Sequence, residues 1–259
     1  MTNEGPQFLY RYRHLEGHHR ERTKRILTES VLYFASPLTF NDPFDCKVHF
    51  RSSVSKWRLK RKYDNLVKKY MPHLNRAQRR AVAASDVKKV NMDQFLTKVT
   101  EGLQDSVNGV GVLSLSATDR NILLWSHYAE GHSGLCLQFL RTNNTPFFGQ
   151  ALQVDYQQDY PDVDLLTKDS NKMINAFLLT KAIDWKYEAE WRIIDHDKGP
   201  GDRVFPEHLL VGVILGARMK PEDQKEVMTW LNRRNKPVQV FRASVGSGAF
   251  SLKIERYLS

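Results

Sequence analysis

KYEAEWRI, residues 186–193, alternates charged and apolar side chains. Alternation with a period of two is typical of a β-strand whose faces meet different surroundings. It therefore predicts a strand in which Glu188, Glu190 and Arg192 share one face. Two carboxylates on one face repel each other unless a cation lies nearby. The stretch is thus either a solvated strand face or the wall of a site, and Arg192 neutralises the pair in both cases.

Comparable patterns on either side of this stretch predict the rest of the fold. Strands are predicted at 8–15, 31–36, 109–118, 134–140, 151–156 and 209–216, followed by a final hairpin over 237–258. Helices are predicted at 20–30, at 119–132 with Asp119 as its cap, at 170–183, and at 221–234 with Pro221 in the first position. The order of elements indicates an α+β protein with a mainly antiparallel or mixed sheet.

Length and composition place the chain among globular proteins. Its 259 residues, 41% of them hydrophobic, predict one large domain over residues 1–259. No run approaches the ~20 apolar residues of a membrane span, and the N-terminus lacks the pattern of a secretory signal. Cys46 and Cys136 have no paired spacing, so neither a disulfide framework nor a zinc site is predicted. We expect a soluble, cytoplasmic protein without a bound metal.

The basic charge is concentrated in one segment. Residues 51–100 contain fourteen Lys or Arg and three Asp or Glu, a net charge of +11, so the remaining residues sum to −1. Residues 54–107 have helical spacing and predict a basic insertion of two or three helices. This density of charge favours binding to the phosphates of RNA or DNA, while a solvated helical face or a surface for an acidic partner protein remains the alternative. The expected contacts are Lys56, Arg58, Lys60, Arg61, Lys62, Lys68, Lys69, Arg76, Arg79 and Arg80.

Three short motifs occur in a suggestive order. Arg11 and Arg13 lie in LYRYR, Ser114 and Ser116 in LSLS, and Glu188 and Glu190 in YEAE. This order resembles the arginine, serine and glutamate motifs of ADP-ribosyltransferases, in which separate strands line one NAD cleft. The resemblance implies an ADP-ribosyltransferase-like split β-sheet core and NAD as substrate. Arginine would hold the pyrophosphate, the serines would line the ribose pocket, Glu190 would be the catalytic carboxylate, and Glu188 would orient the acceptor.

A second resemblance covers most of the chain. LYFASPLTFNDPFD, SLSATDRNILLWSHYAEGHSGLCLQF and KAIDWKYEAEWRII together resemble the bacterial domain-of-unknown-function family numbered 2971. In this reading His127 and Tyr128 contact the nucleotide, while Asn41 and Asp42, with Asp45, shape the rim of the cleft. The alternatives are a helix with His127 partly exposed and a Pro-containing turn with side-chain-to-backbone hydrogen bonds.

Three functional hypotheses follow. The first is an NAD-dependent ADP-ribosyltransferase that modifies RNA or DNA, as a toxin or anti-phage effector restrained by an antitoxin or another neutralising protein. The second is a metal-dependent nuclease that uses Asp184, Lys186 and the two glutamates, completed by Asp42 or Asp45. The third is a non-catalytic protein that binds nucleic acid or a protein partner.

Overall fold

The chain divides into two compact units. The computed structural model describes residues 5–49, 56–89, 91–161, 163 and 170–257. One unit comprises residues 1–40, 109–156 and 183–259, and the other comprises 41–108 and 157–182. The segment 54–107 predicted as an insertion therefore belongs to the second unit, together with residues on both of its sides.

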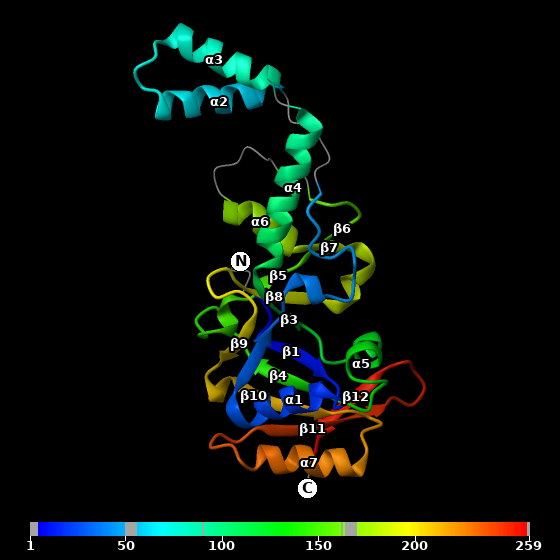
Figure 1. Ribbon diagram of the computed structural model, residues 1–259. Coiled ribbons are helices and arrows are strands. Elements are labelled where there is room, and N and C mark those ends of the chain that lie inside the picture. The colour runs from blue at the N-terminus through cyan, green and yellow to red at the C-terminus, as the bar shows by residue number, and fades with distance from the viewer. Residues whose placement is uncertain (1–4, 50–55, 90, 162, 164–169, 258–259) are drawn as a thin grey trace. The chain divides into compact units, whose positions relative to one another are not determined.

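An eight-stranded mixed sheet forms the centre of the first unit (Figure 1). Its strand order is β12-β11-β10-β4-β1-β3-β8-β5. The strands are β12 (Leu252–Arg256), β11 (Gln239–Val245), β10 (Leu210–Leu215), β4 (Leu135–Leu140), β1 (Phe8–Arg13), β3 (Gly111–Ser116), β8 (Glu190–Asp195) and β5 (Leu152–Gln153). The predicted α+β class with a mixed sheet is confirmed.

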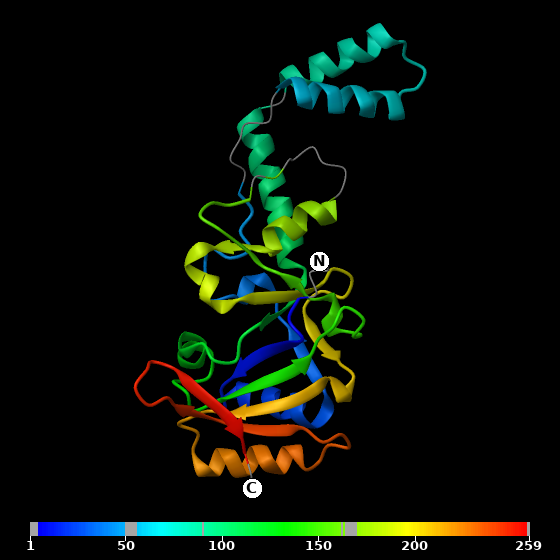
Figure 2. The same cartoon turned by 180° about the vertical axis from the view of Figure 1, so that it is seen from behind.

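Antiparallel pairing dominates the sheet, and its parallel pair has a clear cause. β10 and β11 run parallel, which requires a crossover connection between them. That connection is α7 (Pro221–Leu231), which begins with Pro221 as predicted and runs along the β10–β11 end of the sheet (Figures 1 and 2). The predicted final hairpin is confirmed by the antiparallel pairing of β11 with β12.

The two faces of the sheet pack against different helices. On one face, α1 (His18–Glu29) and α7 complete the larger core, to which β1 contributes Leu9. On the other face, α5 (Ile122–Tyr128) inserts Leu124 and Trp125 into a smaller core, to which β1 contributes Tyr12. We call these the α1 face and the α5 face. Because side chains alternate along a strand, each strand residue belongs to one of them.

Shorter elements complete the first unit. β2 (Val31–Phe34) and β9 (Gly201–Val204) form a two-stranded sheet. The 3₁₀ helices are η1 (Pro37–Thr39), η2 (Phe148–Gln150), η3 (Ile183–Glu188) and η4 (Glu207–Leu209).

The second unit is mainly helical. Its helices are α2 (Lys56–Tyr70), α3 (Arg76–Lys89), α4 (Met92–Asn108) and α6 (Ser170–Leu178). The first three confirm the helices predicted over 54–107, and α2 and α3 lie side by side (Figure 2). The helix predicted at 170–183 is too long: it ends at Leu178, and β7 (Thr180–Ala182) follows and pairs with β6 (Asp155–Gln157). No helix in the described part of the chain is long and apolar enough to cross a bilayer.

Candidate active site

The two glutamates lie at a sharp change in backbone direction rather than on one strand. Glu188 ends the 3₁₀ helix η3, and Glu190 begins β8. Ala189 between them has φ of 45°, in the left-handed region that Ala rarely adopts. Its N–H donates to the carbonyl of Lys186, and its own carbonyl accepts from Ala117 N–H. The strand predicted over 186–193 is therefore wrong for 186–189 and correct from Glu190 onward.

Strand register places Glu190 in a polar row across the α5 face. Glu190 lies directly opposite Ser116, and Ser116 lies directly opposite Tyr10. Tyr10 in turn faces Gln138 of β4, whose amide Nε2 is 3.3 Å from the Tyr10 hydroxyl. Directly opposite residues project from the same face of a sheet. Four neighbouring strands thus contribute Gln138, Tyr10, Ser116 and Glu190, which we call the polar row.

Glu188 is held against this row from two directions. The Ser116 hydroxyl donates to the backbone carbonyl of Glu188 at 2.6 Å. The Tyr128 hydroxyl, from the end of α5, donates to the carboxylate Oε1 of Glu188 at 2.8 Å. Glu188 and Glu190 are both only 5% exposed. Their burial distinguishes the pair from a solvated strand face, which was the alternative left open by the sequence.

Arg192 forms a buried ion pair with Glu190. Its Nε and Nη2 atoms donate to the two carboxylate oxygens of Glu190 at 2.7 and 2.9 Å. The Arg192 side chain is fully buried, and its guanidinium lies 5.5 Å from the centre of the Phe40 ring. Ser114 lies opposite Arg192 in register. The structure thus shows the neutralising role expected of Arg192.

Arg11 and Arg13 lie on the other face of the sheet. Arg13 Nε donates to the Thr23 hydroxyl of α1 at 3.2 Å, and Arg11 Nη1 donates to the backbone carbonyl of Ser114. Leu9, two and four residues before them on β1, belongs to the α1-face core. The expectation that Arg11, the serines and the glutamates share one cleft is not met, because register aligns Tyr10 rather than Arg11 with Ser116.

Tyr10 and Gln138 are members of the row that the sequence analysis missed. Burial, followed by the negative charge of Asp119, raises the pKa of Tyr10 to about 12. The phenol is therefore protonated at neutral pH and can donate a hydrogen bond. The alternation of LYRYR gave a signal that Tyr10 and Tyr12 share a face, but only the strand pairing shows which side chains they face.

The α5 residues differ in exposure. His127 is exposed, whereas Trp125 is fully buried and Tyr128 is half-buried. The predicted cap is also corrected: Asn121, not Asp119, caps the helix, because its side-chain oxygen accepts from the backbone N–H groups of Leu123 and Leu124. The Asp119 carbonyl accepts from Trp125 Nε1, and burial raises the pKa of the Asp119 carboxyl.

Asn41 and Asp42 belong to the second unit. Asp42 Oδ1 accepts from the Phe44 backbone N–H at 2.9 Å, which closes the turn that the sequence analysis considered as the alternative. Asp42 Oδ2 is buried and makes no hydrogen bond. Asp45 lies 3.9 Å from Lys181, and both side chains are buried. Within the described part of the chain, no group of three or more His, Cys, Asp or Glu side chains is arranged to hold a metal ion.

The basic residues of α2 and α3 are mostly exposed where the structure describes them. Arg79 is half-buried, and its Nη1 donates to the Leu74 carbonyl. The side chains of Lys56, Arg58 and Lys62 lie outside the described part of the structure. The exposed basic residues are Lys60, Arg61, Lys68, Lys69, Arg76 and Arg80.

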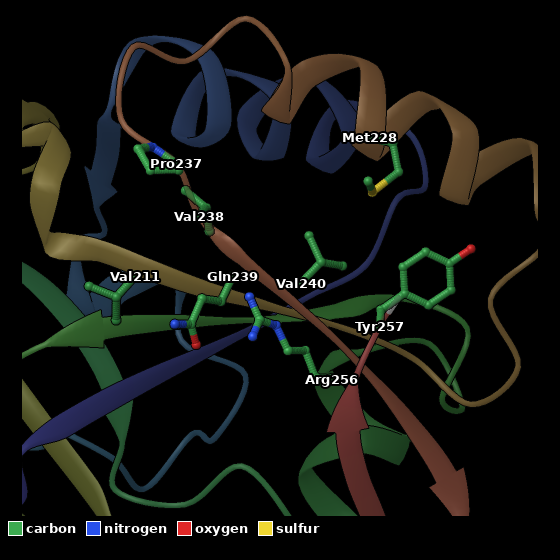
Figure 3. Close-up of a pocket in the computed structure, with 8 residues that line it drawn as sticks. All are labelled: Val211, Met228, Pro237, Val238, Gln239, Val240, Arg256 and Tyr257. Atoms are coloured by element: carbon green, nitrogen blue, oxygen red, sulfur yellow. The ribbon is translucent and has the colours of Figure 1, made fainter. Parts of the chain in front are cut away.

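A separate pocket of about 540 Å³ lies between α7 and β11 (Figure 3). Met228 of α7 and Val240 of β11 line it, with Arg256 at the end of β12. In the strand order, β10, β4, β1 and β3 separate β11 from β8. This pocket is therefore not part of the glutamate site.

Comparison with known proteins identifies a match over part of the chain. A family model described as "Protein of unknown function (DUF2971)" matches residues 124–193. The matched segment runs from α5 to β8 and includes Tyr128, Glu188, Glu190 and Arg192. No curated protein and no solved structure matches the chain. These comparisons provide no link to ADP-ribosyltransferases.

Proposed function

We propose that the protein is an NAD-dependent ADP-ribosyltransferase whose site lies on the α5 face of its sheet. The observation that carries the proposal is the buried pair Glu188 and Glu190, which flanks a left-handed Ala189 beside Ser116. The proposal also requires the sheet to be a divergent form of the ADP-ribosyltransferase fold.

A buried carboxylate suits the chemistry of this reaction. The bond between C1 of the ribose and the nicotinamide nitrogen breaks, and neutral nicotinamide leaves with the bonding electrons. The positive charge that develops on the ribose is like that of glycoside hydrolysis. A carboxylate fixed next to this charge stabilises the transition state, an effect typically worth about 3–4 kcal/mol per group. An acceptor nucleophile then bonds to C1 and releases its proton.

The contacts suggest a division of roles. Glu190, held by two hydrogen bonds from Arg192, would stabilise the charge on the ribose, since a carboxylate paired with a guanidinium is anionic. Glu188, oriented by Tyr128, would position the acceptor. Ser116 would fix the segment that carries both. His127 and Ser114 stay predicted nucleotide contacts.

The role predicted for the two arginines of β1 changes. Arg11 and Arg13 take no part in this proposal, because their side chains lie on the α1 face. Asn41 and Asp42 belong to the other compact unit, and their role at the rim stays a prediction from the sequence.

We infer a nucleic acid as the acceptor. The support is the cluster of exposed lysines and arginines on α2 and α3, since binding to nucleic-acid phosphates depends mainly on such charges. The toxin or anti-phage role, the neutralising protein partner and the cytoplasmic location stay predictions from the sequence.

The test uses NAD labelled with ³²P in its adenylate phosphate. Purified full-length protein is incubated with total RNA, DNA and cell lysate in the presence of a chelator. We expect label on RNA or DNA with the wild type, and a loss of at least 100-fold with Glu190→Gln. Glu255→Gln, at an exposed position of β12, is the matched control and should keep full activity.

Other outcomes separate the remaining hypotheses. Label on protein would keep the transferase and replace the nucleic-acid acceptor. Absence of both label transfer and nicotinamide release would refute the transferase. Cleavage of nucleic acid that requires added magnesium would then indicate the nuclease, whereas binding that survives Glu190→Gln would indicate a non-catalytic protein.

A further inference from the structure

Three arginines lie near one another on β1 and α1, at the α1 face of the sheet. Arg11 and Arg13 project from β1, and Arg22 projects from α1. Arg22 lies over the Tyr33 ring of β2, with 4.3 Å between its guanidinium carbon and the ring centre. The positive charges of Arg13 and Arg22 both act on Arg11, and that of Arg22 acts on Arg13. We call these three residues the arginine cluster.

The described structure provides no carboxylate partner for the arginine cluster. The protein acceptors are the Ser114 carbonyl for Arg11, and Thr23 and His19 for Arg13. Two other arginines of the same helix are paired, each with two carboxylates. Arg20 pairs with Asp223 and Glu226, and Arg25 pairs with Glu29 and Asp202. Among the described residues, the fold therefore neutralises some arginines of α1 and provides no counter-charge for Arg22 and the two arginines of β1.

Burial makes this lack of a counter-charge unfavourable. Arg13 is only 8% exposed, and Arg11 and Arg22 are half-buried. Desolvation, then repulsion from neighbouring arginines, lowers the pKa of Arg11 to about 9 and that of Arg13 to about 10. Both groups still carry their charge at neutral pH. Uncompensated buried charge destabilises a fold, so an anion bound here would stabilise it.

Histidines border the cluster. The rings of His14 and His18 each lie 4.0 Å from the ring of His19, measured between centres. Burial, followed by the charges of His14 and Arg13, lowers the pKa of His19 to about 4, so this ring is neutral at pH 7. Glu16 is the carboxylate that acts on His14.

We propose that Arg11, Arg13 and Arg22 form a binding site for a phosphate group, on the face of the sheet opposite the glutamate pair. A guanidinium can donate two parallel hydrogen bonds to phosphate oxygens. A terminal phosphate or a pyrophosphate offers more oxygens than a carboxylate and carries more negative charge, which suits three neighbouring cations better. The proposal does not depend on the transferase activity, because it concerns different residues on the other face.

The phosphate group has two chemical sources, a small phosphorylated molecule or a nucleic-acid backbone. Calorimetric titration of the full-length protein with sodium pyrophosphate and, separately, with a single-stranded oligodeoxynucleotide distinguishes them. For whichever ligand binds at this site, we expect at least tenfold weaker binding with Arg22→Gln and with Arg11→Gln. Arg20→Gln is the matched control, since Arg20 lies on the same helix but is already paired with carboxylates, and its affinity should stay within twofold of wild type.

A second measurement locates the ligand. Binding at the arginine cluster should shift the NMR signal of the His19 ring, because Arg13 Nη2 lies 3.5 Å from His19 Nδ1. Arg22 is half-buried at the surface of α1, so Arg22→Gln tests the site even if Arg11→Gln does not fold. Failure of the wild type to bind either ligand would overturn the proposal. So would an equal loss of affinity with Arg20→Gln, because binding would then reflect general charge.

Discussion

Replacement of Arg192 by leucine tests the buried ion pair that organises the glutamate site. Arg192 is fully buried and donates to both carboxylate oxygens of Glu190 at 2.7 and 2.9 Å. Arg192→Leu removes this partner while Glu190 stays buried. Loss of one member of a buried pair typically destabilises a protein by about 3–5 kcal/mol. Because whole domains are stable by only about 5–15 kcal/mol, we expect a large shift of the unfolding midpoint.

Two further variants separate charge from geometry. Arg192→Lys keeps the positive charge but cannot form the two parallel bonds, so we expect a loss of about 1.5–3 kcal/mol. The double variant Glu190→Leu/Arg192→Leu removes both charges and should be at least about 1 kcal/mol more stable than Arg192→Leu alone.

Urea denaturation followed by tryptophan fluorescence measures all three variants. We expect the order of stability wild type, Arg192→Lys, Arg192→Leu, from most to least stable. This expectation would be refuted by an Arg192→Leu protein within about 1 kcal/mol of wild type. A double variant less stable than Arg192→Leu would equally show that the two charges do not compensate each other.

Three other predictions concern backbone geometry and pH. Ala189→Gly should stabilise the protein by about 0.5–1 kcal/mol in urea denaturation, because the relief of left-handed strain exceeds the cost of the greater flexibility of glycine in the unfolded state. A loss of stability would contradict a left-handed backbone at position 189. Gly111→Ala should destabilise the protein by about 2–3 kcal/mol, since a Cβ at this position would collide with the Gly199 carbonyl. Gly102 of α4 is exposed and has no such neighbour, so Gly102→Ala should instead stabilise the helix by about 0.5–1 kcal/mol. The pKa of His19 is about 4 in the folded state and about 6.5 in the unfolded state. Between these values the unfolded state binds more protons, so the free energy of unfolding should fall as pH decreases from about 6.5 to 4. His19→Asn should make this pH dependence shallower.

The sequence predicted best the elements that rest on local signals. Pro221 at the start of α7 and the Gly-containing turn between β11 and β12 act through nearby residues, and both elements are confirmed. The helices of 54–107 follow from their apolar spacing in the same way. Local signals were not sufficient where two nearby residues can both cap the same helix. Asp119 and Asn121 are both suitable, but it is the side chain of Asn121 that accepts the hydrogen bonds from the N–H groups of Leu123 and Leu124.

The stretch KYEAEWRI shows the same limit in the glutamate site. Its alternation predicts one strand, yet the chain turns at Ala189, whose carbonyl accepts from the N–H of Ala117, the residue after β3. That bond joins residues far apart in the sequence, so the pattern of eight letters does not contain it. The sequence nevertheless grouped Glu188, Glu190, Ser116 and Tyr128 in one predicted site, and these four residues do lie near one another.

By itself the sequence determined the α+β class, most elements, the basic helices and the presence of charged and polar residues on particular strands. Only the tertiary structure decided which of these residues share a face. Side chains alternate along a strand, so a register shift of one residue moves every side chain to the other face. The pairing of Tyr10 with Ser116 places Tyr10 on the same face as Glu190, and Arg11 and Arg13 on the α1 face. That choice depends on packing between distant segments, and alternation along a single strand cannot specify it.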